Sequence, residues 1–186
     1  MKNNYLMQAW LVLTLAVCFG GALAGVQIGL GPRIEANKLA KIMSQIPKLV
    51  PGAAEGRQQT VGGKTVYCAV DGKGATVGWV VPASGRGFAD KIELLIGLDA
   101  QAKTITGMFV LFQNETPGLG NDIAGDWRRQ LAGKSAMEAV MVTKGAPTGS
   151  NEIEAVTGAT ISSESVCNIV NAAVADFRQS LTERAE

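Results

Sequence analysis

Residues 154–164 read EAVTGATISSE and join a polar turn to the one long, regularly periodic helix predicted in the soluble part of the chain. After Thr160 the apolar residues recur at intervals of three and four, which is the spacing of one helix face. These residues are Val166, Ile169, Val170, Ala173, Val174, Phe177 and Leu181. The pattern predicts a C-terminal helix with a buried stripe.

The start of this helix is a candidate anion site. The hydroxyl groups of Thr160, Ser162 and Ser163 are placed to cap its free N–H groups. Just before them, Gly158 and Ala159 are small enough for the backbone to approach a phosphate closely, and helix N-termini bind phosphate. The same pattern fits an ordinary helix cap with a helper glycine, so both interpretations stand on the residues alone.

A second turn follows the fourth predicted strand, where residues 114–120 read NETPGLG. Proline fixes the backbone torsion of one central residue and glycine accepts the positive φ of the next, so Pro117 and Gly118 predict a tight turn of type II. A turn of this kind does not by itself imply a function.

The two motifs together resemble the periplasmic FMN-binding domain family, which includes the G subunit of the Rnf ion-translocating electron transport complex and the C subunit of the sodium-pumping NADH:quinone reductase. Residues 157–160 match the Ser/Thr-Gly-Ala-Thr signature, whose last threonine carries FMN through a phosphoester bond in that family, and Glu154 stands where the family usually has aspartate. Residues 115–120 match the second signature, a loop beside the flavin. The resemblance implies covalent FMN at Thr160 and further cofactor-binding residues at Thr157, Gly158, Ala159, Glu115, Thr116, Gly118 and Leu119.

Composition excludes several other chemistries. The chain has 186 residues, 47% of them hydrophobic, and a formal net charge of +1, which leaves room for one compact domain and an anchor. Histidine is absent, which removes the usual catalytic triads and most transition-metal sites. Scattered basic residues and few aromatics do not form a nucleic-acid surface. Cys18, Cys68 and Cys167 are too widely spaced for a metal or haem motif, so they are either buried apolar residues or, for Cys68 and Cys167, a disulfide pair.

Residues 6–30 carry no charge and are long enough to cross a hydrocarbon core of about 30 Å. The alternatives are a signal peptide cut after Ala24 and a lipoprotein signal ending at Cys18. The apolar stretch continues to Leu30 and Val17 is large for the residue before a lipidated cysteine, so we expect a retained anchor. Family resemblance implies that the amino terminus lies inside and the domain outside.

The rest of the chain alternates strand and turn signals. Residues 33–46 predict a juxtamembrane helix that continues from the anchor and ends at Pro47. Strands are predicted at 65–70, 75–81, 92–98, 104–112 and 139–143, with a glycine-rich connection at 84–88 and a polar loop at 145–151. Trp127 and Leu131 fit a short helix, in which the Trp127 indole is expected to belong to the core.

The predicted fold class is α+β, with one N-terminal transmembrane helix (1–31), a juxtamembrane helix and linker (32–62), and a single mixed-sheet FMN-binding domain (63–186) with a C-terminal packing helix. The predicted function is electron relay by an inner-membrane flavoprotein subunit of an Rnf-type ion-translocating oxidoreductase, which is not a stand-alone enzyme. Its implied partners are the other membrane subunits and a flavin transferase. The alternatives are a C-type subunit of a sodium-pumping NADH:quinone reductase and a non-redox tethered binding or assembly module.

Overall fold

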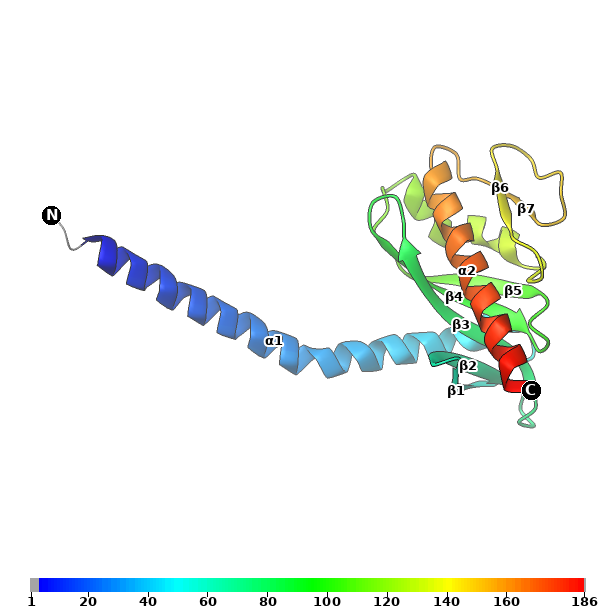
Figure 1. Cartoon of the computed structure of the whole chain (residues 1–186), viewed down its shortest axis with the longest axis horizontal. Coiled ribbons are helices and arrows are strands. Elements are labelled where there is room, and N and C mark those ends of the chain that lie inside the picture. Colours follow the sequence, from blue (N-terminus) through cyan, green and yellow to red (C-terminus); the bar gives the residue numbers. More distant parts are fainter. Residues whose placement is uncertain (1–3, 186) are drawn as a thin grey trace. The chain divides into compact units, whose positions relative to one another are not determined.

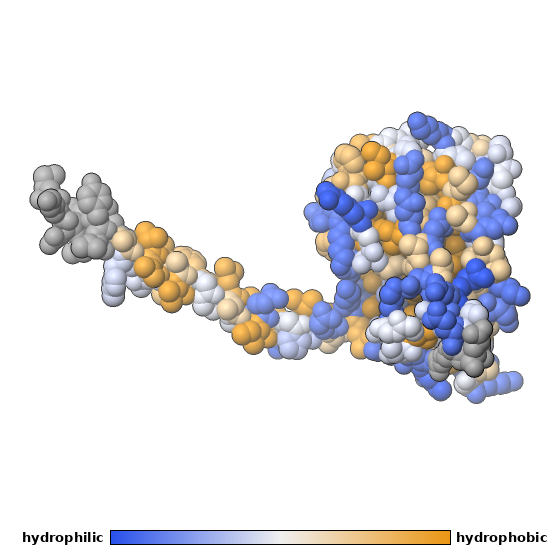
Figure 2. Space-filling view, in the orientation of Figure 1, coloured by the Kyte–Doolittle hydropathy of each residue, from blue (hydrophilic) through white to orange (hydrophobic). Residues whose placement is uncertain are grey.

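The computed structural model describes residues 4–185 and divides the chain into two compact units, Met1–Lys41 and Ile42–Glu186. One helix, α1 (Asn4–Leu49), supplies the first unit and enters the second. Within the described residues it is the one helix long and apolar enough to cross a membrane, and its hydrophobic side chains lie exposed along it (Figure 2). The helix predicted at residues 33–46 continues without a break from the apolar segment before it. Pro47 falls inside the last turn rather than at its end.

The second unit is built on a five-stranded sheet whose order is β1-β2-β3-β4-β5, with every neighbouring pair antiparallel (Figure 1). A separate parallel pair, β6 and β7, follows two short 3-10 helices, η1 and η2. The α+β class is confirmed. The antiparallel and parallel pairings of the predicted mixed sheet occur in two separate sheets, the antiparallel one formed by β1 to β5 and the parallel one by β6 and β7. The bounds are β1 (Glu55–Val61), β2 (Lys64–Val70), β3 (Thr76–Arg86), β4 (Lys91–Asp99), β5 (Ile105–Phe112), η1 (Gly120–Ala124), η2 (Asp126–Leu131), β6 (Met141–Thr143) and β7 (Glu152–Glu154).

Two segments differ from the sequence-based expectation. The linker at 32–62 contains β1, an edge strand whose polar sequence and mostly exposed side chains carry little hydrophobic signal. The glycine-rich segment at 84–88 is largely strand, because Ser84, Gly85 and Arg86 pair with residues 93, 92 and 91 of β4. A Cβ atom on Gly85 would lie 2.5 Å from Ile169 Cγ1, so this glycine allows the C-terminal helix to pack closely against the sheet.

Helices cover both faces of the five-stranded sheet. On one face, α2 (Thr160–Ala185) buries its predicted stripe against alternate residues of β4, including Ile92, Leu94 and Ile96 (Figure 1). Its Phe177 ring contacts Trp79 of β3 with ring centroids 5.5 Å apart. The opposite face packs against the domain part of α1, through a cluster of Ile42, Ile46, Leu49, Val50, Tyr67, Ala69, Val80 and Leu95. The sheet is therefore the middle of three layers.

Candidate functional site

Thr160 is the first residue of α2, and the turn before it is held by local hydrogen bonds. Gly158 has φ +78°, a torsion that favours glycine, and the Ala159 amide donates to the Val156 carbonyl over 2.9 Å. The first backbone bond within the helix is donated by Ser163 to the Ala159 carbonyl at 3.1 Å. The turn at Gly158 thus reverses the path of the chain, and α2 begins directly after it at Thr160, as predicted.

The serines after Thr160 do not act as the predicted caps. Ser163 Oγ accepts a hydrogen bond from the Val156 amide at 2.9 Å and donates to the Ala159 carbonyl at 3.1 Å, which locks the turn onto the helix. Ser162 Oγ donates to Glu115 Oε2 at 2.5 Å. Within the described part of the chain, the backbone amides of residues 160–162 have no hydrogen-bond acceptor, and the Thr160 hydroxyl has no hydrogen-bond partner. The helix start therefore presents free donors and a free hydroxyl, which suits an anion.

The second motif forms the predicted turn. The Leu119 amide donates to the Thr116 carbonyl at 3.2 Å across Pro117 and Gly118, and Gly118 has φ +76°, as a type II turn requires. Asn121 Oδ1 accepts from the Gly118 amide at 2.9 Å and fixes the turn from its other side. Thr116, Gly118 and Leu119 are exposed.

The fold brings the two motifs into contact. A Cβ atom on Gly158 would lie 3.0 Å from Leu119 Cδ2, so the Pro-Gly turn rests on the glycine turn before Thr160. Glu115, 4% exposed, reaches Ser162 in the first turn of α2. Residues 157–160 and 115–119 thus form one surface, as expected for two halves of one site.

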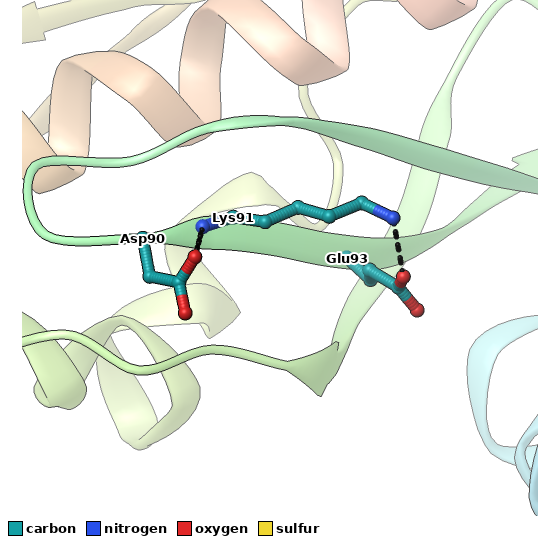
Figure 3. Close-up of polar contacts among 3 residues, drawn as sticks. All are labelled: Asp90, Lys91 and Glu93. Atoms are coloured by element: carbon teal, nitrogen blue, oxygen red, sulfur yellow. Dashed lines mark hydrogen bonds and ion pairs between the residues drawn. The ribbon is translucent and has the colours of Figure 1, made fainter. Parts of the chain in front are cut away.

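A third segment, the β3–β4 hairpin connection, joins this surface. The amides of Ala89 and Asp90 donate to Glu115 Oε1 at 3.1 and 3.5 Å. The hairpin is braced locally, because the Lys91 amide donates to Asp90 Oδ1 and its ammonium group meets Glu93 Oε1, both at 2.7 Å (Figure 3). Sequence analysis missed Ala89 and Asp90 because their contribution comes from the backbone, which leaves no residue-type signal.

Each of the three segments that meet through Glu115 and Gly158 carries an exposed large apolar side chain. Phe88 is 60% exposed, Leu119 43% and Ile161 55%, and they come from the hairpin connection, the Pro-Gly turn and the start of α2. Large apolar side chains left in water beside a polar turn are typical of a ligand or partner surface. A cavity of about 450 Å³ between α2 and strands β1 to β3 is lined by none of the predicted site residues, so this cavity is not the predicted site.

Trp127 and Glu154 support the glycine turn from behind. The Trp127 indole N–H donates to the Glu154 carbonyl at 2.6 Å. Gln130 Nε2 donates to the same carbonyl at 3.3 Å, and Gln130 Oε1 accepts from the Glu154 amide at 2.9 Å. Trp127 also packs against the hydrophobic core, which confirms its predicted structural role. The Glu154 carboxylate itself is exposed.

Other site types are not formed by the residues that the structure describes. No group of three or more metal-ligating side chains occurs among them. Cys68 and Cys167 are buried free thiols, so the disulfide alternative is wrong and the buried apolar alternative is confirmed for both. Burial, with a smaller contribution from Glu164, raises the pKa of Cys167 to about 12, which keeps this thiol neutral and unreactive.

Comparison with known proteins places the site in a family. Residues 87–175 match the FMN-binding domain model, a region that spans the hairpin connection, the Pro-Gly turn and the start of α2. The chain is 32% identical over 163 residues to the G subunit of the proton-translocating ferredoxin:NAD(+) oxidoreductase complex of Clostridium ljungdahlii, covering 87% of this chain and 86% of that one. The chain belongs to the G-subunit family of ion-translocating oxidoreductase complexes.

Other relatives agree with this family. The G subunit of the Na(+)-translocating ferredoxin:NAD(+) oxidoreductase complex of Acetobacterium woodii is 44% identical over 105 residues, which is 54% of this chain but only 49% of that relative. The C subunit of the Na(+)-translocating NADH-quinone reductase of Parabacteroides distasonis has a similar crystal structure, with a TM-score of 0.56 at 25% identity over 63% of this chain and 62% of that one. This protein and that reductase component thus share the domain fold.

Proposed function

We propose that the protein is an electron-transport subunit that carries FMN covalently attached to Thr160 through a phosphoester. The observation that supports this most directly is the Thr160 hydroxyl, which lies without a described partner at the start of α2, inside the matched FMN-binding region. The Pro-Gly turn, the second motif expected beside the flavin, packs against the same turn.

The residues present fit such a group. The phosphate would lie against the free amides of residues 160–162, where the helix dipole favours negative charge. Gly158 leaves room for it and the buried Ala159 side chain packs in the core beneath, while Thr157 and Thr116 offer hydroxyl groups at the surface. Leu119 offers an apolar contact for the ring, with Gly118 shaping the turn beneath it. The bound flavin supplies the redox chemistry, and the chain supplies position and retention.

Attachment needs a partner enzyme, because the chain has no histidine and the buried carboxylate of the site, Glu115, is hydrogen-bonded to Ser162 and Ala89 and not to Thr160. We propose that a flavin transferase uses FAD as the donor. The Thr160 oxygen forms a bond to the phosphorus of the FMN half, the pyrophosphate P–O bond breaks, AMP leaves, and the hydroxyl proton passes to a base of the transferase or to solvent. No electrons are transferred in this step.

We further propose that α1 holds the domain on the outer face of a bacterial-type inner membrane, next to the other membrane subunits of an Rnf-type complex. The support is the apolar length of α1 and the ion-translocating complexes named for the relatives. An anchor limits diffusion of the flavin, and a covalent tether prevents its loss from an open surface.

In-gel flavin fluorescence tests the attachment. Protein from its native host is denatured and separated, and we expect a fluorescent band that disappears in Thr160→Ala. Thr182→Ala is the matched control, because it removes an exposed threonine hydroxyl of the same helix outside the proposed site and is expected to retain fluorescence. A fluorescent Thr160→Ala band would refute the assignment, and a wild-type band without fluorescence or added mass would favour the non-redox binding module.

A further inference from the structure

Glu115 is a buried carboxylate that connects three segments distant in sequence. Its own segment is the Pro-Gly turn, its Oε1 accepts from the Ala89 amide of the hairpin connection, and its Oε2 accepts from Ser162 of α2 across 47 residues of sequence. The Glu115 amide is held in turn by Gln113 Oε1 at 2.6 Å. Both carboxylate oxygens are therefore occupied by protein donors.

Two glycines enclose this carboxylate. A Cβ atom on Gly120 would lie 2.8 Å from Ser162 Oγ, 2.9 Å from Glu115 Cβ and 3.1 Å from Glu115 Oε2. A Cβ atom on Gly87 would collide with Glu115 Oε1. Real Cβ atoms do not approach other atoms so closely, so a larger residue does not fit at Gly87 or Gly120 beside the Glu115 carboxylate.

No lysine or arginine among the described residues forms an ion pair with Glu115. Burying a carboxylate without a cation is costly unless hydrogen bonds replace its water, and a neutral residue would fill the space at lower cost. Hydrogen bonds to a charged acceptor are about twice as strong as neutral ones, and two of them fix direction as well as distance. The arrangement favours a role in holding geometry over a role in packing.

We propose that Glu115 is a positioning residue, not a flavin contact: it clamps the first turn of α2 to the β3–β4 hairpin connection and so sets where Thr160 and its attached flavin lie. Ser162 is two residues beyond Thr160 on the same helical turn, so a shift of one moves the other. On the hairpin side, the clamp places Phe88 beside the site. This inference rests on the proposed attachment at Thr160.

Three variants test the clamp. Glu115→Ala removes both hydrogen bonds, Ser162→Ala removes only the bond to α2, and Glu115→Gln keeps the shape and can still accept from Ala89 while donating to Ser162. The control is Glu164→Gln, an exposed carboxylate at the start of the second turn of α2. Each is made in the full chain, coexpressed with the transferase, and melting temperature is recorded to separate unfolding from misplacement.

We expect Glu115→Ala to lower the flavinylated fraction about tenfold, because losing charge-assisted bonds reduces the population in the attachment geometry. Ser162→Ala is expected to lose less, Glu115→Gln to recover most of the wild-type level, and Glu164→Gln to match wild type. In the flavinylated remainder, Glu115→Ala and Ser162→Ala shift the flavin emission spectrum and midpoint potential. If Glu115→Ala does not fold, Ser162→Ala and Glu115→Gln carry the test.

Wild-type levels of attachment with unchanged spectra in Glu115→Ala and Ser162→Ala would overturn the inference. Amide hydrogen exchange on protein produced without transferase gives a readout that needs no flavin. The clamp predicts faster exchange at Ala89 in Glu115→Ala and no change in Glu164→Gln. A wild-type protein that never acquires flavin, but shows this exchange pattern, would refute the proposed function while leaving the clamp intact.

Discussion

Replacing Gly120 with alanine adds one methyl group at the most crowded point between the two motifs. The new carbon would lie 2.8 Å from Ser162 Oγ and 2.9 Å from Glu115 Cβ, on either side of the 2.5 Å hydrogen bond between these residues. Gly120 has no positive φ, so backbone strain does not contribute. The effect therefore reports the contact itself.

The magnitude follows from overpacking. Forcing a methyl group into a filled interior costs about 1–3 kcal/mol of unfolding free energy. If Ser162 and Glu115 separate, loss of a hydrogen bond to a charged group adds about 1.5–3 kcal/mol. At about 2–4 °C per kcal/mol for a domain of roughly 150 residues, overpacking alone lowers the melting temperature by about 2–12 °C. If the hydrogen bond is lost as well, the fall is about 5–24 °C.

Thermal unfolding of the full chain in detergent, followed by near-ultraviolet circular dichroism, measures this change. Gly145→Ala is the matched control, since an added Cβ there meets no atom within 4 Å and the residue has no positive φ. The control is expected to change unfolding free energy by less than about 0.5 kcal/mol. Equal melting temperatures for Gly120→Ala and Gly145→Ala would show that the motifs are not packed as described.

Three further predictions concern the core and the anchor. Phe177→Ala removes a buried ring that contacts Trp79, so we expect a loss of about 3–5 kcal/mol in denaturant unfolding, and a loss below about 1 kcal/mol would contradict the packing of α2. The pKa of Cys167 is raised from 9.0 to about 12 in the folded protein, so the unfolded chain releases this proton at lower pH and the free energy of unfolding should fall as pH rises from about 9 to about 12. Cys167→Ala should flatten that part of the pH–stability curve. An unchanged slope would exclude this thiol as its source. Leu15→Arg should oppose membrane insertion by about 2.5–3.5 kcal/mol, giving partial loss from the carbonate-resistant membrane fraction, while full retention would argue that Leu15 is not near the middle of the span.

Features controlled by local chemistry can be predicted from the order of the residues alone. The three-and-four spacing after Thr160 specified α2 and its buried face, since one helix turn repeats within a few residues. Pro117 followed by Gly118 specified a tight turn, because the torsions belong to those residues alone. The uncharged residues 6–30 specified a helix with an apolar surface.

How these elements meet depends on contacts between residues that are distant in the chain. β1 is positioned by its pairing with β2, which its polar sequence does not predict. The end of α1 is positioned by packing against the sheet, which Pro47 does not predict. The bond between Glu115 and Ser162 spans 47 residues, and the Ala89 contribution is a backbone amide common to nearly every residue type. Such contacts depend on the path of the whole chain, because hydrogen bonds at a distance in sequence form only once the sheet and α2 have closed the loops between them.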